Sequence, residues 1–209
     1  MAPARVAVIG GGVAGLMCAT RCQEKGLAPI VFDTGKNTVG GRASSRLMKF
    51  EGADGGRVAL KVDHAAQFFV AQREAFTPYV ARWAEAGAVQ PWDATVGTVL
   101  KGSGFRATPT PSAGTPLCRW VAAGGMGELW EKHVAAQLSD VRRPVWVSAL
   151  ERTASGGWRV MDGNGALLAE VEYVVIAHNG KCVSSQTITA VNFPGHTLER
   201  IACVLRRTG

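Results

Sequence analysis

The apolar and polar positions near the N-terminus predict a strand, a helix and a second strand. Arg5–Ile9 contains an unbroken apolar run that ends in glycines, which is typical of a parallel strand buried on both faces. Residues 13–25 predict a helix, and Gly26 is a natural stop just after it. Residues 29–33 are largely apolar again and predict a second strand. Together these segments predict one β-α-β unit with parallel strands.

The middle of the chain predicts a hairpin, two helices and a connecting loop. Two extended segments flank a glycine-containing turn and predict the hairpin, at residues 46–50 and 58–62. Apolar residues near helical spacing predict helices over residues 75–86 and 125–138. A segment rich in Gly, Pro, Ser and Thr, residues 102–116, predicts the loop, and it follows an extended segment at residues 89–100.

Short apolar segments separated by turn sequences predict a series of strands toward the C-terminus. Residues 155–157 and 162–165 supply the Gly, Asn and Asp that hairpin turns favour. After Lys181 the pattern fails, so residues 182–209 predict a tail outside the fold. The predicted strands are residues 145–150, 158–161, 167–171 and 173–177.

Composition places the chain among globular proteins. It has 209 residues, 47% of them hydrophobic and 19% charged. Because there is no apolar run of about eighteen residues and no room for a targeting segment before the first strand, we expect no membrane span. We therefore expect a cytoplasmic location, or an organellar one if a longer precursor exists. The net charge of +7 is scattered along the chain, so we expect no nucleic-acid partner.

The five cysteines favour neither a disulfide framework nor a zinc site. Their number is odd and no Cys-x-x-Cys motif occurs. Cys18 and Cys22 are four residues apart, so on a helix they share a face, and we interpret them as small core residues. No cluster of residues with metal-ligand spacing, no carboxylate pair and no nucleophile elbow is evident, so we expect no metal ion.

The first candidate for chemistry is a G-x-G-x-x-G motif between the first strand and the first helix. Gly10 permits a tight turn, Gly12 lets a pyrophosphate approach the backbone, and Gly15 lets the helix pack closely on the strand. The first helical residues, Val13 and Ala14, then present free N–H groups to the phosphates. Asp33, at the end of the second strand, can accept hydrogen bonds from a ribose.

A second glycine turn favours FAD over NAD as the cofactor. Gly40 and Gly41 allow the backbone to lie against a ligand, and Arg42 supplies a permanent cation for phosphate. A plain NAD-binding domain does not need this second turn. The alternative from local sequence alone is an ordinary turn with a solvated arginine.

Residues 6–33 followed by residues 38–46 resemble the N-terminus of the FAD-dependent amine oxidase superfamily. The phrase VDHAAQFF at residues 62–69 is similar to the renalase-like branch of FAD/NAD(P)-binding oxidoreductases, of plant and algal type. Residues 124–127 resemble that family's glycine turn before a helix, and residues 174–180 resemble a strand that returns to the cofactor domain. The resemblance covers about residues 5–181.

This resemblance implies a role for each matching position. Gly10, Gly12 and Gly15 would contact the FAD pyrophosphate, Gly41 and Arg42 would line the pyrophosphate and ribityl path, and Asp33 would hold the adenosine ribose. Backbone atoms of Val147 would meet the adenine, and three residues would lie near the isoalloxazine: Ala65, Ala66 and Gln67. No catalytic residue is assigned, because the flavin accepts the hydride itself and both His64 and His178 are interpreted as packed or hydrogen-bonded residues.

The resemblance also implies a fold class and a domain division. We expect an α/β protein with a doubly wound, Rossmann-like FAD-binding domain of the glutathione-reductase type. The FAD/NAD(P)-binding domain would comprise residues 1–60 and 140–181, and a partial antiparallel substrate domain would comprise residues 61–139. Family members are usually longer, and residues 182–209 do not resemble the family's continuation, so we expect a C-terminally truncated member.

Three functions remain open at this point. The first is an FAD-dependent oxidoreductase that takes a hydride from an amine or a dihydronicotinamide and passes electrons to O2. The second is a truncated, non-catalytic module that binds a dinucleotide or a partner. The third is an NAD-binding protein in which Gly41 and Arg42 are incidental. Bound flavin separates the first from the third, and reduction of that flavin by a substrate separates the first from the second.

Overall fold

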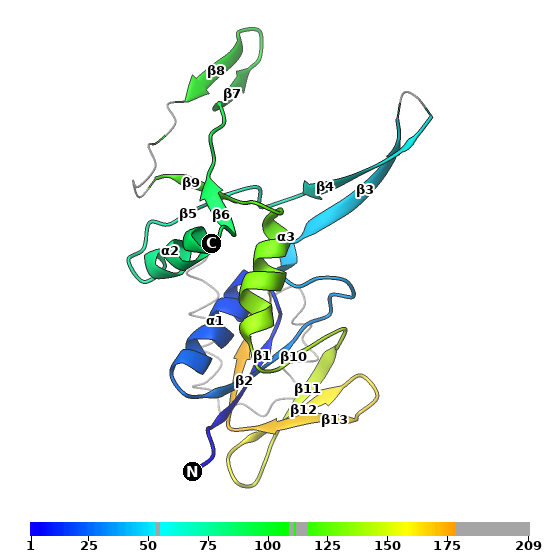
Figure 1. The fold of residues 1–209 in the computed structure, drawn as a ribbon. Helices are drawn as coiled ribbons and strands as arrows, with labels where there is room; N and C mark the ends of the chain where they lie inside the picture. Colours follow the sequence, from blue (N-terminus) through cyan, green and yellow to red (C-terminus); the bar gives the residue numbers. More distant parts are fainter. Residues whose placement is uncertain (53–54, 109–110, 112–116, 179–209) are drawn as a thin grey trace. The chain divides into compact units, whose positions relative to one another are not determined.

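The computed structural model describes residues 1–52, 55–108, 111 and 117–178, so the predicted tail at residues 182–209 lies outside the described residues (Figure 1). The chain divides into two compact units. Unit 1 comprises Met1–Gly41 and the chain from Val134 onward, and unit 2 comprises Arg42–His133. The hairpin predicted at residues 46–50 and 58–62 falls within unit 2.

Unit 1 is built around a four-stranded parallel sheet in the order β10-β2-β1-β14. The first strand, β1 (Arg5–Ile9), is central, because it pairs with β2 (Ala28–Phe32) on one side and β14 (Tyr173–Ile176) on the other. Strand β10 (Val141–Arg142) extends the sheet beside β2. Since both faces of β1 and β2 are covered, nearly every residue in them is buried, as the apolar runs predict.

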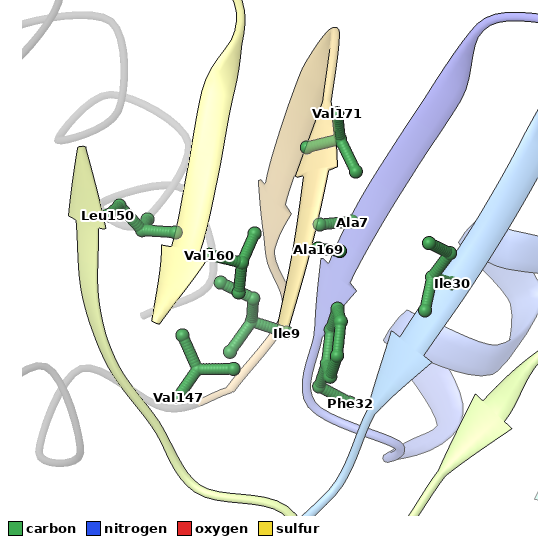
Figure 2. Close-up of a cluster of buried hydrophobic side chains, with 9 residues drawn as sticks. All are labelled: Ala7, Ile9, Ile30, Phe32, Val147, Leu150, Val160, Ala169 and Val171. Carbon is green, nitrogen blue, oxygen red and sulfur yellow. The ribbon is translucent and has the colours of Figure 1, made fainter. Parts of the chain in front are cut away.

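A helix and a second sheet complete unit 1. Helix α1 (Val13–Glu24) connects β1 to β2 and buries Gly15, Leu16 and Ala19. An antiparallel meander packs its apolar side chains against those of the parallel sheet, as Figure 2 shows. Its strands are β11 (Val147–Arg152), β12 (Trp158–Asp162) and β13 (Leu167–Val171). The core between the two sheets comprises Ala7, Ile9, Ile30, Phe32, Val147, Leu150, Val160, Ala169 and Val171.

The described part of unit 2 contains three small antiparallel sheets and two helices, α2 and α3 (Met126–Glu128). The first sheet is the predicted hairpin, β3 (Ser45–Glu51) with β4 (Arg57–Asp63). The others are β5 (Phe69–Val70), β9 (Arg119–Ala122) and β6 (Val89–Pro91), and β7 (Val96–Leu100) with β8 (Gly104–Thr108). Helix α2 (Thr77–Glu85) buries Val80 and Trp83, and Trp83 contacts the rings of Phe69, Phe76 and Trp130.

The structure confirms the predicted α/β class with a Rossmann-like parallel sheet, and it corrects three local predictions. The loop predicted at residues 102–116 is wrong for Gly104–Thr108, which form β8 and pair with β7, while residues 109–110 and 112–116 lie outside the described residues. Strands β5, β9 and β10 are not among the predicted strands. The predicted helix at residues 125–138 is helical but irregular: α3 (Met126–Glu128) continues as a π-helical stretch, Leu129–Val134, and a 3₁₀ turn, Ala135–Gln137.

Candidate functional site

The N-terminus of α1 is an uncapped helix end. Gly12 is the N-cap residue, and no side chain among the described residues caps the first turn, which contains no acidic residue. The first bond of the helix runs from the Leu16 N–H to the Gly12 carbonyl oxygen, at 2.9 Å. The preceding N–H groups have no partner within the helix, and they carry the positive end of the helix dipole. Val13 and Ala14 are exposed, so this end can receive an anion.

Two glycines of the motif are required by the packing of the protein itself. Gly10 has a φ of +116°, and a Cβ there would lie 3.0 Å from the carbonyl carbon of Ala177. Gly15 is buried, and a Cβ there would overlap the carbonyl oxygen of Gly10 and lie 3.2 Å from the Cβ of Ala177. Gly10 therefore forms the tight turn and Gly15 allows the close helix–strand packing, as the motif predicts.

Gly12 differs from both, because none of the described residues requires a glycine at this position. Its φ of −74° and ψ of 176° are open to any residue. A Cβ there would meet no heavy atom of the described chain within 4 Å. The space in front of Gly12 is consequently free, at the point where the helix presents its N–H groups. A ligand that lies against the backbone gives a physical reason for glycine at this position.

The second glycine turn lies directly against the first within unit 1. The Gly40 N–H donates to the carbonyl oxygen of Gly11 at 2.7 Å, and Gly12 and Gly40 form a parallel β-bridge. Gly40 and Gly41 have φ values of +98° and +56°, which favour glycine. A Cβ on Gly41 would lie 3.4 Å from the Cα of Gly12. The two turns thus lie side by side: Gly11 and Gly40 are buried where they meet, Gly12 is partly exposed and Gly41 is exposed.

The carboxylate of Asp33 is held in place by backbone donors on both sides. The N–H of Gly11 donates to Oδ2 and the N–H of Gly35 donates to Oδ1, each at 2.7 Å. A carboxylate has further lone pairs, so both oxygens can still accept a ribose hydroxyl. The bond from Gly35 is a contact that the sequence reasoning missed, although an Asp followed by Gly two positions later is a signal for such a turn.

The other predicted site residues lie on separate segments of the chain and not in the two glycine turns. Val147 is 9% exposed, and its side chain lies in the core, which leaves only its main chain for a ligand. Arg42 is exposed in the 3₁₀ turn Gly41–Ala43, directly after the second glycine turn. The last three predicted residues lie in unit 2 between β4 and β5: Ala65, Ala66 and Gln67. There the Ala66 N–H donates to the Arg42 carbonyl oxygen at 3.2 Å. The role of every one of these residues stays a prediction.

Within unit 2, the base of the hairpin is tied to the start of α3. The Met126 N–H donates to Asp63 Oδ1 and Oδ2 at 3.0 and 3.1 Å, and the Gly127 N–H donates to Ser45 Oγ at 2.8 Å. Asp63 also accepts a hydrogen bond from Ser45 Oγ. Asp63 therefore supplies the cap that α3 needs, and it fixes the point at which residues 64–67 leave the hairpin.

A charged cluster beside this cap gives a pH-dependent prediction. Glu128 accepts hydrogen bonds from Lys132 at 2.8 Å and Lys61 at 3.0 Å, and these lower the pKa of Glu128 from 4.5 to about 2. Because the folded pKa is lowered, the stabilisation by this cluster is present above pH 4.5 and is lost as the pH falls through about 2. A carbon-detected NMR titration should give a Glu128 midpoint near 2, and a higher one in Lys132→Met; a wild-type midpoint near 4.5 would contradict the cluster.

Cys18 and Cys22 share one face of α1, as predicted, and both are partly buried. Burial raises the pKa of the Cys18 thiol, and Cys22 raises it further through charge repulsion and a hydrogen bond. A raised pKa disfavours the reactive thiolate. Across the described ranges, no group of three His, Cys, Asp or Glu side chains is placed to hold a metal ion. In the part of the chain that the structure describes, every helix is too short or too polar to cross a bilayer.

Comparison with known protein families identifies the part of the chain that carries this site. Residues 8–83 match the family of NAD(P)-binding Rossmann-like domains. Together with the parallel sheet, this match shows a Rossmann-like domain fold. A curated relative, the bifunctional protein for tRNA 5-methylaminomethyl-2-thiouridine biosynthesis of Caulobacter sp. (strain K31), is 32% identical over 191 residues. That match covers 84% of this chain, and the chain spans 31% of the relative's length.

Solved structures share the fold of this domain at low sequence identity. A fatty acid isomerase from P. acnes, which produces CLA, has a TM-score of 0.65 and 11% identity, with 93% of this chain and 62% of that chain covered. A putrescine oxidase variant has a TM-score of 0.55 and 13% identity, with 84% and 58% covered. An FAD-containing monooxygenase from Photorhabdus luminescens subsp. laumondii TTO1 has a TM-score of 0.50 and 12% identity, with 85% and 40% covered. The Rossmann-like fold is thus one that FAD-dependent oxidoreductases use.

Proposed function

We propose that the chain is an FAD-dependent oxidoreductase of the amine oxidase type, similar to the renalase-like branch. It would take a hydride from an amine or a dihydronicotinamide and pass the electrons to O2. The observation that carries this proposal is the free space in front of Gly12 at the uncapped end of α1. A dinucleotide pyrophosphate is the anion that fits this position after the first strand of a Rossmann-like sheet.

The second glycine turn supports FAD over NAD. Gly40 is hydrogen-bonded to Gly11 and bridged to Gly12, so the backbone at Gly41 continues the surface that begins at the helix N-terminus. This arrangement offers a ligand more backbone to contact than the helix N-terminus alone. The ribityl chain of FAD is the additional segment that would use it. A putrescine oxidase and an FAD-containing monooxygenase share the fold, which supports the same choice.

In this proposal each predicted site residue has a role in binding. The N–H groups at Val13 and Ala14 hold the pyrophosphate, Asp33 accepts a ribose hydroxyl, and the main chain of Val147 contacts the adenine. Three residues of the segment after Asp63 would lie near the flavin ring: Ala65, Ala66 and Gln67. FAD supplies the hydride acceptor when it is bound, so the protein's own part is to hold the substrate against it and exclude water.

The proposed partners are small molecules. They are the amine or dihydronicotinamide substrate and O2, and the proposal includes neither nucleic acid nor a membrane as a partner. The proposed location is cytoplasmic. The basic residues are scattered along the sequence and not clustered in one segment, which supports the absence of a nucleic-acid partner from this proposal. No catalytic side chain is proposed.

Arg42 gives a test of the second glycine turn. Arg42 is exposed in the 3₁₀ turn, so its guanidinium is available to a phosphate. Arg42→Ala should weaken FAD binding by about 1–3 kcal/mol, the range for a lost charge-assisted hydrogen bond. Titration of the apoprotein with FAD, followed by quenching of flavin fluorescence, measures this difference. Equal affinities in the two proteins would mean that Arg42 is merely solvated.

Anaerobic reduction of the bound flavin tests the proposed activity. The flavin-loaded chain is mixed with putrescine, benzylamine or dihydronicotinamide dinucleotide isomers, and the absorbance of the oxidised flavin is followed. We expect bleaching by at least one of these compounds, and recovery of the absorbance when air is admitted. Flavin that is bound but reduced by none of them would favour the alternative, a non-catalytic dinucleotide-binding module. A chain that takes up NAD in place of FAD would favour the third function.

A further inference from the structure

Strand β4 is an edge strand, because its sheet in unit 2 contains only β3 and β4 among the described residues (Figure 1). The Gly52 N–H donates to the Gly56 carbonyl oxygen at 2.7 Å, and the ladder continues from this bond without a bulge. Main-chain groups of an antiparallel pair point alternately toward the partner strand and away from it. The residues of β4 whose N–H and C=O groups point away from β3 are therefore Arg57, Ala59, Lys61 and Asp63.

This edge is open to another strand. No main chain in the described part of the protein pairs with the outward groups of β4, and Arg57, Ala59 and Lys61 are exposed. A lone two-stranded hairpin is only marginally stable in water, whereas three or more strands with an apolar face are stable. The hairpin has such a face, with exposed fractions from 42% to 51%, made of Met48, Phe50, Val58 and Leu60.

The sequence of β4 is complementary to itself in one antiparallel register. Centred on Leu60, the pairing of two copies covers the whole strand and sets Arg57 opposite Asp63 of the second copy, twice by symmetry. Opposite charges directly across from each other stabilise two paired strands. Centred one residue earlier or later, the pairing would set Lys61 opposite Arg57 or opposite a second Lys61, and such like charges are destabilising.

The same register also matches the apolar side chains. Val58 comes opposite Val62 of the second copy, and Leu60 comes opposite the second Leu60. These rungs lie between the hydrogen-bonded ones, where facing side chains are closest. The carboxylate of Asp63 is held by the Met126 N–H at the start of α3, and it keeps lone pairs for an arginine. Charge, apolar contact and main-chain donors thus favour one arrangement.

We propose that two copies of this chain pair through β4, antiparallel and centred on Leu60, to form a four-stranded sheet in the order β3-β4-β4-β3. The interface uses the same strand of both copies, so it closes as a dimer. The second copy supplies the further strands that the hairpin lacks, and the apolar face becomes continuous across both hairpins. This inference does not depend on the proposed cofactor or activity.

Sedimentation equilibrium of the full chain over a wide range of concentration tests the pairing. The mass should rise toward about 44 kDa, twice the 22.0 kDa of one chain. Ala59→Pro removes an outward N–H that the hairpin does not use, so it should raise the dissociation constant of the dimer about tenfold or more. Lys49→Pro is the matched control, because Lys49 is paired with Ala59 and its N–H points outward on the opposite edge. It should leave the dissociation constant unchanged.

A cysteine at the two-fold axis tests the register, and it does so even if Ala59→Pro fails to fold. In Leu60→Cys the two sulfur atoms would face each other across a close rung, within the range of a disulfide. Mild oxidation should therefore give a covalent dimer on a non-reducing gel. Met48→Cys is the control, because Met48 is paired with Leu60 but lies on the outer strand of the four. The wild type, oxidised in the same way, accounts for the native cysteines.

Four results would overturn this interface. They are a wild-type monomer at every concentration, an equal effect of the two proline variants, cross-linking of Met48→Cys as readily as Leu60→Cys, and a mass that grows beyond two chains. The last result would indicate open-ended strand addition in place of a closed pair.

Discussion

Gly12→Val should abolish FAD binding and leave the fold intact. The φ and ψ at Gly12 suit valine, and a side chain there meets no atom of the described chain within 4 Å. The added methyl groups occupy the space in front of the first turn of α1, where the pyrophosphate would lie. We expect the variant to keep its unfolding midpoint and to lose flavin, measured by absorbance after desalting.

Gly163→Val is the matched control for this variant. Gly163 lies in the turn between β12 and β13 of the same unit, and a Cβ there also meets nothing within 4 Å. Both substitutions add the same side chain at an open position, so a general effect of valine on folding or purification would appear in both. Flavin retained by Gly12→Val at the wild-type level would show that the ligand lies elsewhere. Unfolding of Gly12→Val alone would show that the glycine has a structural reason.

Gly15→Val should have the opposite signature, a large loss of stability. Gly15 is buried, and even a Cβ would overlap the Gly10 carbonyl oxygen. Helix α1 would have to move away from the end of β1 to make room, which removes Leu16 and Ala19 from the core. Overpacking of this kind costs about 1–3 kcal/mol or more, a large part of the roughly 5–15 kcal/mol of a typical domain.

The urea midpoint of Gly15→Val measures this loss. We expect a clear decrease relative to the wild type, with flavin lost together with the fold. A wild-type midpoint would mean that the helix and strand are not packed as closely as the structure places them. Substitution of Gly15 should thus remove stability, because Gly15 faces the chain. Substitution of Gly12 should remove flavin binding, because Gly12 faces open space.

The β-α-β unit could be predicted from sequence because its two central strands are buried on both faces. Their apolar runs need no partner from far along the chain to be recognised, and α1 ends within one residue of the predicted end. Strand β10 could not be predicted, because it has only 2 residues and is held by pairing with β2. Strand β8 contains Gly and Thr, which hide its alternation, so composition favoured a loop there.

The site could be predicted where it depends on neighbours in sequence and not where it depends on the fold. The role of Gly12 follows from a strand, a turn and a helix in succession. The bonds from Gly11 and Gly35 to Asp33 need β1 and β2 to lie side by side.

The visible absorption spectrum of the purified wild-type chain, desalted after incubation with FAD, tests the central claim most directly. The account predicts the two flavin bands in a stoichiometric amount, because the free helix end and the two adjoining glycine turns are present in this chain. A folded, colourless chain that takes up no FAD would contradict the account.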